Sequence, residues 1–493
     1  MTERPINTVA PGIAVRELLP APDVESCFLR YRELPYCVLL DSALRNPELG
    51  RYSFLAADPF AIHCHQEPAQ HAKKSHPFAP LSEHLSQYAS PTLPELPPFQ
   101  GGVVGLLNYE LGRDFETLPA AEFDHKVCPR LLLASYDVVL AWDHAQNRAW
   151  LISQGWPEVD PARRQSRAKA RLTTFEQLLA LPLEEAAAIG KSWSAQFKRP
   201  TTDNDQHILI KSCPRVETHL RGVCSNFSRV EYEAAVEQVR EYIRAGDVFQ
   251  VNLAQCLTVP QTEPAWQIYL RLRQRNPATF GGYFDGGTWQ LLSASPERFL
   301  QVRDRAVETR PIKGTRPRTA WPEASLFHGD DLMASDKDRA ENIMIVDLLR
   351  NDLSRVCEPD SVQVPELCRL ERYEYVQHLV SVVQGRLAAG KTVWDLFRAA
   401  WPGGSITGAP KLRAMEIITE LERLARGPYC GSLIYHGFDG AADSNLLIRT
   451  IVATGDECSF SVGGGITLAS EPTLEYAETW HKAAGLLRAL GIN

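Results

Sequence analysis

Strand-like and helix-like apolar patterns follow one another in this chain without regular alternation, and this irregular order limits the folds that it can adopt. Short strand-like runs occur at Tyr36–Leu40, Asp137–Trp142, Arg148–Ser153 and Gln290–Ser293. A helical pattern begins at Ser228, which has the spacing of a capping box with Glu231. Doubly wound parallel sheets require strands and helices in succession. The mixed order therefore predicts the α+β class.

The 493 residues divide into three stretches by composition. Residues 1–155 are rich in strand patterns, and residues 227–485 mix strands with helices. Residues 156–226 contain an Ala/Leu/Glu-rich helical pattern after two prolines, followed by a polar run. We therefore predict an N-terminal region, a linker or peripheral insertion, and a C-terminal region. The most basic run of the chain, from Arg163 to Arg171, is interpreted as the solvated face of a helix.

The overall composition argues against several classes of protein. The net charge of −8 at pH 7 provides no cationic surface for a nucleic-acid backbone, so we expect no nucleic-acid partner. No apolar run is long enough to cross a bilayer, and the N-terminus lacks the basic and apolar regions of a signal peptide. The 11 cysteines include no CxxC pair, which favours free thiols in a reducing compartment. We expect a cytoplasmic protein that binds no membrane.

Two pairs of acidic residues have helical spacing. Asp338 and Glu341 lie three residues apart, as do Glu475 and Glu478, and Lys482 follows Glu478 by four residues. Each pair would project from one helix face. Mg²⁺ binds one or two carboxylates and completes its octahedron with water and substrate oxygens, so two such helices offer a cation site. Two solvated acidic helix faces would give the same pattern.

Further candidates for chemistry lie in glycine-rich and isolated positions. Two predicted loops, at 403–411 and at Gly463–Gly465, have backbone N–H groups that can cradle an anion, although turns explain most glycine clusters. Lys313 lies between Pro-Ile and Gly, where burial would make it a nucleophile and exposure an ordinary lysine. Glu297 could act as a general acid if its pKa is raised. His378, alone in an apolar run, has the pattern of a packed core histidine.

Taken together, these segments resemble the chorismate-utilising enzymes, which include the anthranilate, aminodeoxychorismate, isochorismate and salicylate synthases. The matching runs follow the family's order and cover nearly all of residues 228–482. They include SASPERF (293–299), PIKGTRPR (311–318), DRAENIMIVDLLRNDLSRV (338–356) and GGGITLASEPTLEYAETWHK (463–482). The resemblance implies the family's α+β fold, with antiparallel sheets packed as a sandwich core and helices outside.

Two positions help to choose the branch of the family. Isochorismate-type enzymes have a water-activating lysine where this chain has Gln250, which disfavours water as the nucleophile. Anthranilate synthases usually read PIAGT where this chain reads PIKGT, and the lysine is the mark of aminodeoxychorismate synthase component I. The resemblance thus implies conversion of chorismate and ammonia into 4-amino-4-deoxychorismate, for p-aminobenzoate and folate synthesis. Anthranilate synthase component I is the alternative, and a non-catalytic regulatory protein that binds chorismate or tryptophan is a remote one.

The resemblance also implies roles for individual residues. Lys313 would attack chorismate covalently, Glu297 would protonate the leaving hydroxyl, and His378 would complete the catalytic group. Mg²⁺ is the expected cofactor, held directly by Glu341 and Glu478 and through water by Asp338 and Glu475. The positions that grip the substrate or line its pocket are Gly314, Thr315, Ser405, Tyr429, Arg449, Gly463, Gly464, Gly465 and Lys482. A bound tryptophan is expected at Ser42, Leu49, Gly50, Arg51, Tyr52, Thr279, Phe280 and Gly281.

Ammonia is expected to come from a second protein. The chain contains no GxCxG nucleophile turn of a glutaminase, since Cys430 lies in the run YCGS. The resemblance therefore implies a separate glutamine amidotransferase subunit, component II, with free ammonia as a poorer substitute.

Overall fold

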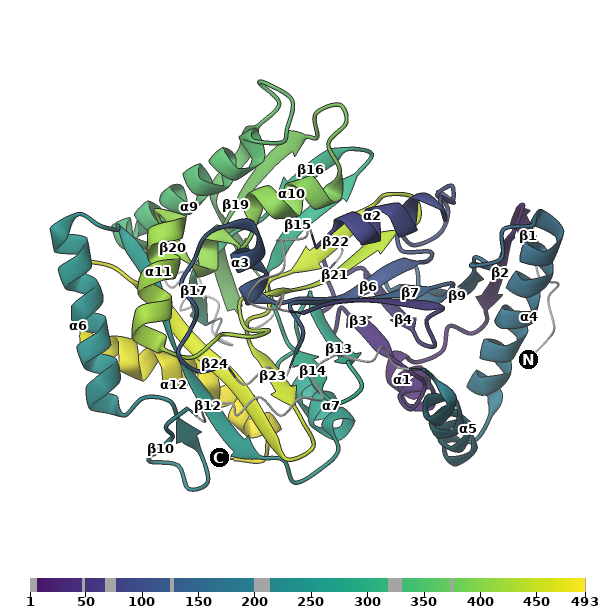
Figure 1. Cartoon of the computed structure of the whole chain (residues 1–493), viewed down its shortest axis with the longest axis horizontal. Helices are drawn as coiled ribbons and strands as arrows, with labels where there is room; N and C mark the ends of the chain where they lie inside the picture. The colour runs from purple at the N-terminus through teal and green to yellow at the C-terminus, as the bar shows by residue number, and fades with distance from the viewer. Residues whose placement is uncertain are drawn as a thin grey trace.

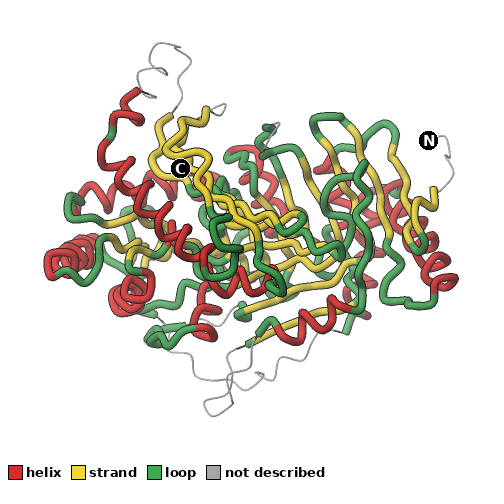
Figure 2. The backbone as a smooth tube through the Cα atoms, turned by 90° about the horizontal axis from the view of Figure 1, so that it is seen from above, coloured by secondary structure: helices red, strands yellow, loops and turns green. Residues whose placement is uncertain are grey.

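Two large sheets form the centre of the molecule, with helices outside them (Figure 1; Figure 2). The computed structural model describes residues 7–46, 49–66, 77–124, 128–198, 213–317, 330–372 and 376–492. Within these residues the sheets contain 14 and 10 strands, and neighbouring strands run antiparallel. The predicted α+β class is therefore confirmed.

The first sheet joins strands from both ends of the sequence. From one edge to the other its strands are β1 (Asn7–Ala10), β2 (Ile13–Leu18), β9 (Arg148–Ser153), β8 (Val138–Asp143), β4 (Tyr52–Ala56), β3 (Val38–Asp41), β13 (Gly281–Asp285), β14 (Gln290–Ser293), β23 (Thr450–Ala453), β24 (Glu457–Ile466), β12 (Gln250–Pro260), β11 (Cys224–Ser225) and β10 (Val216–Glu217), with β20 (Gly408–Ala409) beside β12. The pairing of β3 with β13 connects the N-terminal strands to the C-terminal ones.

The second sheet is built in the same way. Its order is β17 (Ile312–Pro317), β19 (Val376–Arg386), β16 (Ala306–Thr309), β15 (Arg298–Arg303), β22 (Ala442–Asn445), β21 (Ser432–Gly437), β6 (Gly102–Leu107), β7 (Leu131–Tyr136) and β5 (Ala61–His65), with β18 (Gln363–Arg372) beside β19. Here β21 pairs with β6 across the two halves of the sequence. Both sheets therefore extend through the predicted N-terminal and C-terminal regions.

Helices cover the outer faces and the ends of the molecule. They are α1 (Val24–Tyr31), α2 (Ala79–Ser86), α3 (Gly112–Phe115), α4 (Pro161–Ala180), α5 (Leu183–Gln196), α6 (Arg229–Ala245), α7 (Ala265–Arg275), α9 (Asp336–Ser354), α10 (Val393–Ala400), α11 (Lys411–Glu422) and α12 (Pro472–Ala489), with 3₁₀ turns η1 (Tyr109–Leu111) and η2 (Gly404–Ile406). Of the helices in the described residues, none has the length and apolar character that a membrane crossing requires. The capping box predicted for α6 is present, because Ser228 and Glu231 each accept the other's backbone N–H.

The apolar core lies between the two sheets and under the helices. Side chains of both sheets meet in one buried cluster, which includes Val38, Phe54, Val104, Leu132 and Leu433. A second cluster fills the space between the first sheet and α1, α4, α7 and α12. A third lies between the second sheet and helices that include α9 and α10. Burying one face against the other sheet and the opposite face under helices is the sandwich arrangement expected from the resemblance.

Helices α4 and α5 occupy the stretch that the composition marked as a linker or peripheral insertion. The apolar stripe of α4 is buried against the first sheet and α1, through Ala168, Leu172, Phe175 and Leu178. This half of the stretch therefore packs as part of the core. Residues 199–212, which complete its polar run, lie outside the described residues.

The basic run on α4 is not a solvated face throughout. Arg171 binds Asp58 and Asp137 at 2.6 and 3.0 Å, while Arg164 and Arg167 donate to backbone carbonyls of residues 154 and 156. The interpretation of the whole run as solvated was wrong, because buried carboxylates and carbonyls beneath the helix need these partners. Arg163 and Lys169 do face solvent.

Candidate active site

Lys313 stands on β17 beside a bulge that only glycine accommodates. The register with β19 shifts between Lys313 and Thr315, and the intervening Gly314 has a φ of +69°. A Cβ on Gly314 would lie 2.6 Å from Leu332 and 3.0 Å from the carboxyl carbon of Asp338. The left-handed backbone and the close approach of α9 both require glycine here. The bulge thus brings β17 and the acidic face of α9 together.

Ser405 links two of the three residues for which catalysis was predicted. Its hydroxyl donates to Glu297 Oε1 at 2.9 Å, and its backbone carbonyl accepts from Lys313 Nζ at 3.2 Å. Ser405 lies in η2, between α10 and α11, while Glu297 immediately precedes β15. Three segments that are far apart in sequence therefore place an amine and a carboxyl group around one serine.

Burial changes the protonation of both groups in the direction that catalysis requires. Glu297 is only 5% exposed, and burial raises its pKa to about 7 despite the hydrogen bond from Ser405 and the nearby Lys313. Burial also lowers the pKa of Lys313, opposed by Glu341 and Glu297 and assisted by Lys482. A carboxylic acid with a raised pKa and an amine with a lowered pKa can serve as general acid and nucleophile.

His378 and Arg449 form another part of the site. His378 lies on β19 opposite Thr315, and burial, followed by the charge of Arg449, lowers its pKa to about 4. The imidazole is therefore neutral at pH 7. Among the described residues, no carboxylate or other hydrogen-bonding group pairs with the Arg449 guanidinium, whose pKa is lowered by burial. Its backbone is also left-handed, with a φ of +51°. A half-buried cation with no hydrogen-bonding partner among the described residues has the chemistry of an anion-binding group.

Gly463–Gly465 form part of strand β24, so the prediction of a glycine-rich loop was wrong. They pair with Ala254, Leu253 and Asn252 of β12. The amides of Ala254 and Asn252 donate away from β24, to Glu422 and to the carbonyl of Thr407. In an antiparallel ladder the amides of Gly463 and Gly465 then also point away from β12. Strand β23 pairs with β24 only at Ser459 and Cys458, so these amides lie on an edge that β23 leaves uncovered.

The four acidic residues expected to bind a metal lie on α9 and α12, and the α12 pair is close to these glycines. A Cβ on Gly464 would lie 3.4 Å from both Glu475 and Glu478 and 3.5 Å from Lys482. Lys482 donates to Gly463 O and forms an ion pair with Glu478, each at 2.7 Å. Burial raises the pKa of Glu341 and of Glu475, and each is affected by a neighbouring carboxylate.

These acidic residues can supply some of the ligands of a cation but not a complete set. Within the described ranges, no three His, Cys, Asp or Glu side chains are grouped closely enough to form a complete metal site. However, Glu341 Oε1 is buried without a hydrogen-bond partner, although a negative oxygen in that position needs one. One or two carboxylates with water and substrate oxygens suit Mg²⁺, so the donor chemistry fits that ion.

The remaining predicted substrate positions also lie in this region. Tyr429 is buried, and Cys430 after it has a left-handed φ of +63°. The backbone of Thr315 pairs with that of His378, and its side chain is outside the described part of the structure.

Arg426 and Glu422 support the site although sequence reasoning assigned them no role there, and Gln250, which served only to choose the family branch, lies on β12, to which Arg426 donates. Arg426 is buried, binds Glu422 at 2.6 Å, and donates to the carbonyls of Ile406 and Asn252, so it ties η2 to β12. Gln250 is fully buried, and neither its side-chain nitrogen nor its oxygen has a hydrogen-bond partner. A Cβ on Gly465 would lie 2.4 Å from Gln250 Nε2. The sequence signal for the first pair was the i,i+4 spacing of Glu422 and Arg426.

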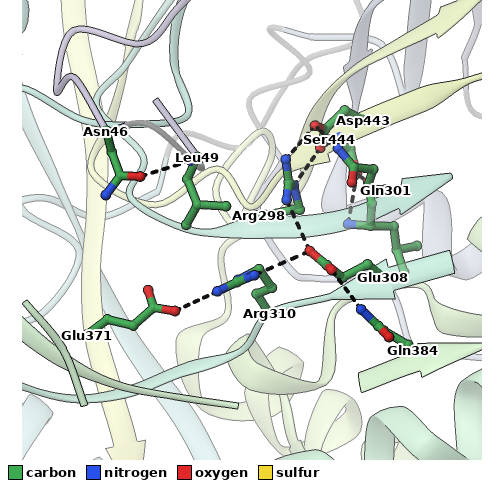
Figure 3. A network of polar contacts seen from close by, with 11 residues as sticks. Asn46, Leu49, Arg298, Gln301, Glu308, Arg310, Glu371, Gln384, Asp443 and Ser444 are labelled. Atoms are coloured by element: carbon green, nitrogen blue, oxygen red, sulfur yellow. Dashed lines mark hydrogen bonds and ion pairs between the residues drawn. The ribbon is translucent and has the colours of Figure 1, made fainter. Parts of the chain in front are cut away.

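A separate cavity of about 420 Å³ lies between the N-terminal strands and β15 and β16. Its lining includes every residue of the expected tryptophan site except Gly50: Ser42, Leu49, Arg51, Tyr52, Thr279, Phe280 and Gly281. Gly50 instead packs against the backbone of Leu44. Figure 3 shows the polar wall of this cavity, in which Arg298, Glu308, Arg310 and Asp443 take part.

Comparisons with known proteins agree with this geometry. The family model described as chorismate binding enzyme matches residues 37–488. Aminodeoxychorismate synthase component 1 of Klebsiella aerogenes is 38% identical over 92% of this chain and 94% of its own length. Anthranilate synthase component 1 of Thermus thermophilus is 40% identical over 84% of this chain and 80% of its own. The crystal structure of anthranilate synthase component I from Streptococcus pneumoniae is similar with a TM-score of 0.72 and 28% identity, over 88% of this chain and 92% of that one. The chain therefore belongs to the family of chorismate-binding enzymes.

Proposed function

We propose that the chain converts chorismate and ammonia into 4-amino-4-deoxychorismate. The observation that carries this proposal is the joint contact of Lys313 and Glu297 with Ser405, which places an amine of lowered pKa beside a carboxyl group with a pKa of about 7. Both relatives named above are component 1 proteins, and they differ in the product that their names give. The lysine is the feature of this chain that distinguishes the two reactions.

The proposed reaction consists of two displacements. Neutral Lys313 Nζ attacks C2 of chorismate, the ring double bond shifts, and the C4 hydroxyl leaves as water with the proton of Glu297. Ammonia then attacks C4, the double bonds shift back, and Lys313 leaves C2 as a neutral amine because its bound nitrogen has kept its proton. The new C4 ammonium group returns one proton to Glu297. The net change replaces hydroxyl by amine at C4 and releases one water. Splitting a difficult displacement into two lowers the barrier of each.

Substrate binding is assigned to the cationic and amide groups around the glycines. Arg449 can form a bidentate pair with a carboxylate, and the amides of Gly463 and Gly465 can donate to another oxygen. Glu341 and Glu478 would hold Mg²⁺, with Asp338 and Glu475 reaching it through water. The ion would neutralise the ring carboxylate and fix the ring. Mg²⁺ binding can be measured without turnover, by calorimetry, and Glu341→Gln is expected to weaken it at least about tenfold.

Identification of the product tests the proposal directly. Chorismate, ammonia and Mg²⁺ are incubated with the chain, and the products are separated by chromatography and identified by mass spectrometry. We expect 4-amino-4-deoxychorismate, whereas anthranilate would overturn the proposal. Lys313→Ala should lower the rate by at least about 10³-fold, and Lys313→Arg, which keeps the charge, should be equally inactive because a guanidinium is not a nucleophile.

The nitrogen source is proposed to be a glutamine amidotransferase subunit. With glutamine as the only donor, the isolated chain should form no product, and addition of such a subunit should restore formation. Product from glutamine in the absence of a partner would contradict this assignment.

A tryptophan molecule is proposed for the 420 Å³ cavity, whose lining contains seven of the eight predicted positions. Calorimetric titration with tryptophan, using Tyr52→Ala as the comparison, tests it.

A further inference from the structure

We propose that Glu308 is a positioning residue that holds Glu297 and Lys313 in register by bridging Arg298 and Arg310. This inference rests on the proposed roles of Glu297 and Lys313. It concerns the wall between the active site and the 420 Å³ cavity, which contains Glu308 and both arginines (Figure 3).

The bridge is a chain of five alternating charges. Arg298 binds Asp443 through two hydrogen bonds of 2.9 and 3.0 Å and donates to Glu308 at 3.2 Å. Glu308 lies 3.6 Å from Arg310, which in turn donates to Glu371 at 2.6 Å. Figure 3 shows that Glu308 occupies the centre of this chain, where it also accepts from Gln384 at 3.1 Å.

Each arginine of the bridge is close in sequence to one catalytic side chain. Arg298 directly follows Glu297. Arg310 is separated from Lys313 by only two residues, Pro311 and Ile312. The backbone between these points is held as well, because Leu446 N donates to Glu297 O at 3.1 Å and Ser381 N donates to Pro311 O at 3.2 Å. Displacement of either arginine therefore pulls on a short, constrained segment that bears a reacting group.

The end of the chain reaches the third predicted catalytic residue. Glu371 of β18 is the register partner of His378 on β19, and its charge opposes the lowering of the His378 pKa. One network of charges is thus connected to all three residues. It reaches Glu297 and Lys313 through the backbone and His378 through the charge of Glu371.

Removal of the central carboxylate should displace the arginines. The side chains of Arg298 and Arg310 are 8% and 12% exposed, so water provides little screening. Without Glu308 the two cations repel each other across a poorly hydrated gap. Because catalysis depends on placement to a fraction of an ångström, a shift of about 1 Å at the reacting groups would cost up to about 10²-fold in rate.

The experiment compares Glu308→Gln with a matched bridge that lies elsewhere. Glu358 also joins two arginines, Arg305 at 2.9 Å and Arg386 at 3.7 Å, but this bridge is exposed. We expect Glu308→Gln to lower kcat by about 10- to 100-fold with a KM for chorismate within about threefold. Glu358→Gln should leave both constants unchanged. Glu308→Asp, which retains the charge, should recover most of kcat.

A pH profile separates positioning from general loss of structure. Ser405 and Lys313 both hold the pKa of Glu297 down, so weakening of their contacts in Glu308→Gln should raise that pKa above its value of about 7. The alkaline limb of kcat/KM, along which Glu297 loses the proton that it must donate, should then move to higher pH. A kcat equal to that of Glu358→Gln, or an aspartate variant as slow as the glutamine variant, would overturn the proposal. A different product of the unmodified chain would instead contradict the proposed function, since the rate ratios of the variants do not depend on which amine is formed.

Discussion

The active site and the cavity wall are both rich in charged side chains. Lys482 and Glu478 of the active site form an ion pair, but other charges of the two regions differ in pairing. In the wall, Arg298 and Arg310 are each bound to carboxylates, and Asp41 is bound to Arg273 at 2.6 Å. In the active site, Arg449 and Glu341 Oε1 have no protein partner among the described residues, and Lys313 donates to a carbonyl.

This difference shows which region is prepared for a charged ligand. A buried charge left without a partner costs the folded state several kcal/mol, so such groups persist where a ligand completes them. Paired charges, in contrast, already satisfy one another and contribute to the geometry of the fold. The comparison therefore supports the proposed substrate binding in the first region and the proposed positioning role of the wall.

The largest effect is expected for Glu297, the acid of the active site. Glu297→Gln removes the proton donor and should lower kcat by about 10²- to 10⁴-fold. In the unmodified chain, kcat/KM should fall as pH rises above about 7, because the donor then loses its proton. A steady-state pH profile checks both statements, and full activity of the variant would remove Glu297 from the mechanism.

The same substitution should stabilise the fold at alkaline pH. The folded pKa of Glu297 is about 7, above the ordinary value of 4.5, so its contribution to stability is fully present below pH 4.5 and is lost as pH rises through 7. Glutamine does not ionise. The quantity to compare is the Tm of Glu297→Gln minus the Tm of the unmodified chain. Thermal unfolding should show that this difference is a few degrees larger at pH 8 than at pH 4.5. A fall in Tm at pH 8 would contradict the raised pKa.

In the cavity wall, breaking a pair should affect stability and leave binding intact. Arg273→Gln would leave the Asp41 carboxylate, whose side chain is 1% exposed, without its cation. We expect a loss of about 3–5 kcal/mol in the free energy of unfolding, measured by denaturant titration. The KM for chorismate should not change. An altered KM with unchanged stability would reverse the assignment of the two regions.

In the active site, removing the cation without a partner should affect binding and leave stability intact. Arg449→Gln should raise the KM for chorismate by about 10- to 100-fold, because a charge-assisted hydrogen bond contributes about 1.5–3 kcal/mol. The unfolding free energy should stay equal or rise, since a half-buried charge without a partner among the described residues is lost. The exposed Arg163 provides a control, for which Arg163→Gln should change neither quantity.

The smallest effect is expected far from both regions, at the start of α6. Ser228→Ala removes the hydroxyl that accepts from the backbone of Glu231 and should cost about 1 kcal/mol of stability. Steady-state constants should be unchanged. Altered steady-state constants would show that α6 influences the active site, although α6 belongs to neither of the two regions.

Local patterns in the sequence were sufficient for several elements. The hairpin of β8 and β9 and the N-cap of α6 follow from neighbouring residues, because turns and caps are formed within a few positions. Spacing and sequence neighbours mark Lys313, Glu297 and the two acidic pairs as candidates, and the family resemblance implies a role for each. What remained open was where these groups lie relative to one another.

The tertiary structure decided the questions that depend on distant partners. Gly463–Gly465 look like a loop by composition but form a strand, since β12 offers a complete ladder to their backbone. The arginines of α4 look solvated by their helical run, yet Arg171 turns inward because Asp137 is buried beneath it. Likewise Glu297 meets Ser405, 108 residues away, only in the packed fold. The bridge at Glu308 also needs Gln384, 76 residues away, and Asp443, which holds Arg298. The sequence determined which chemical groups the chain carries and the family it belongs to. Burial and proximity, which are properties of the packed fold, determined which of those groups are charged, paired or left available for a ligand.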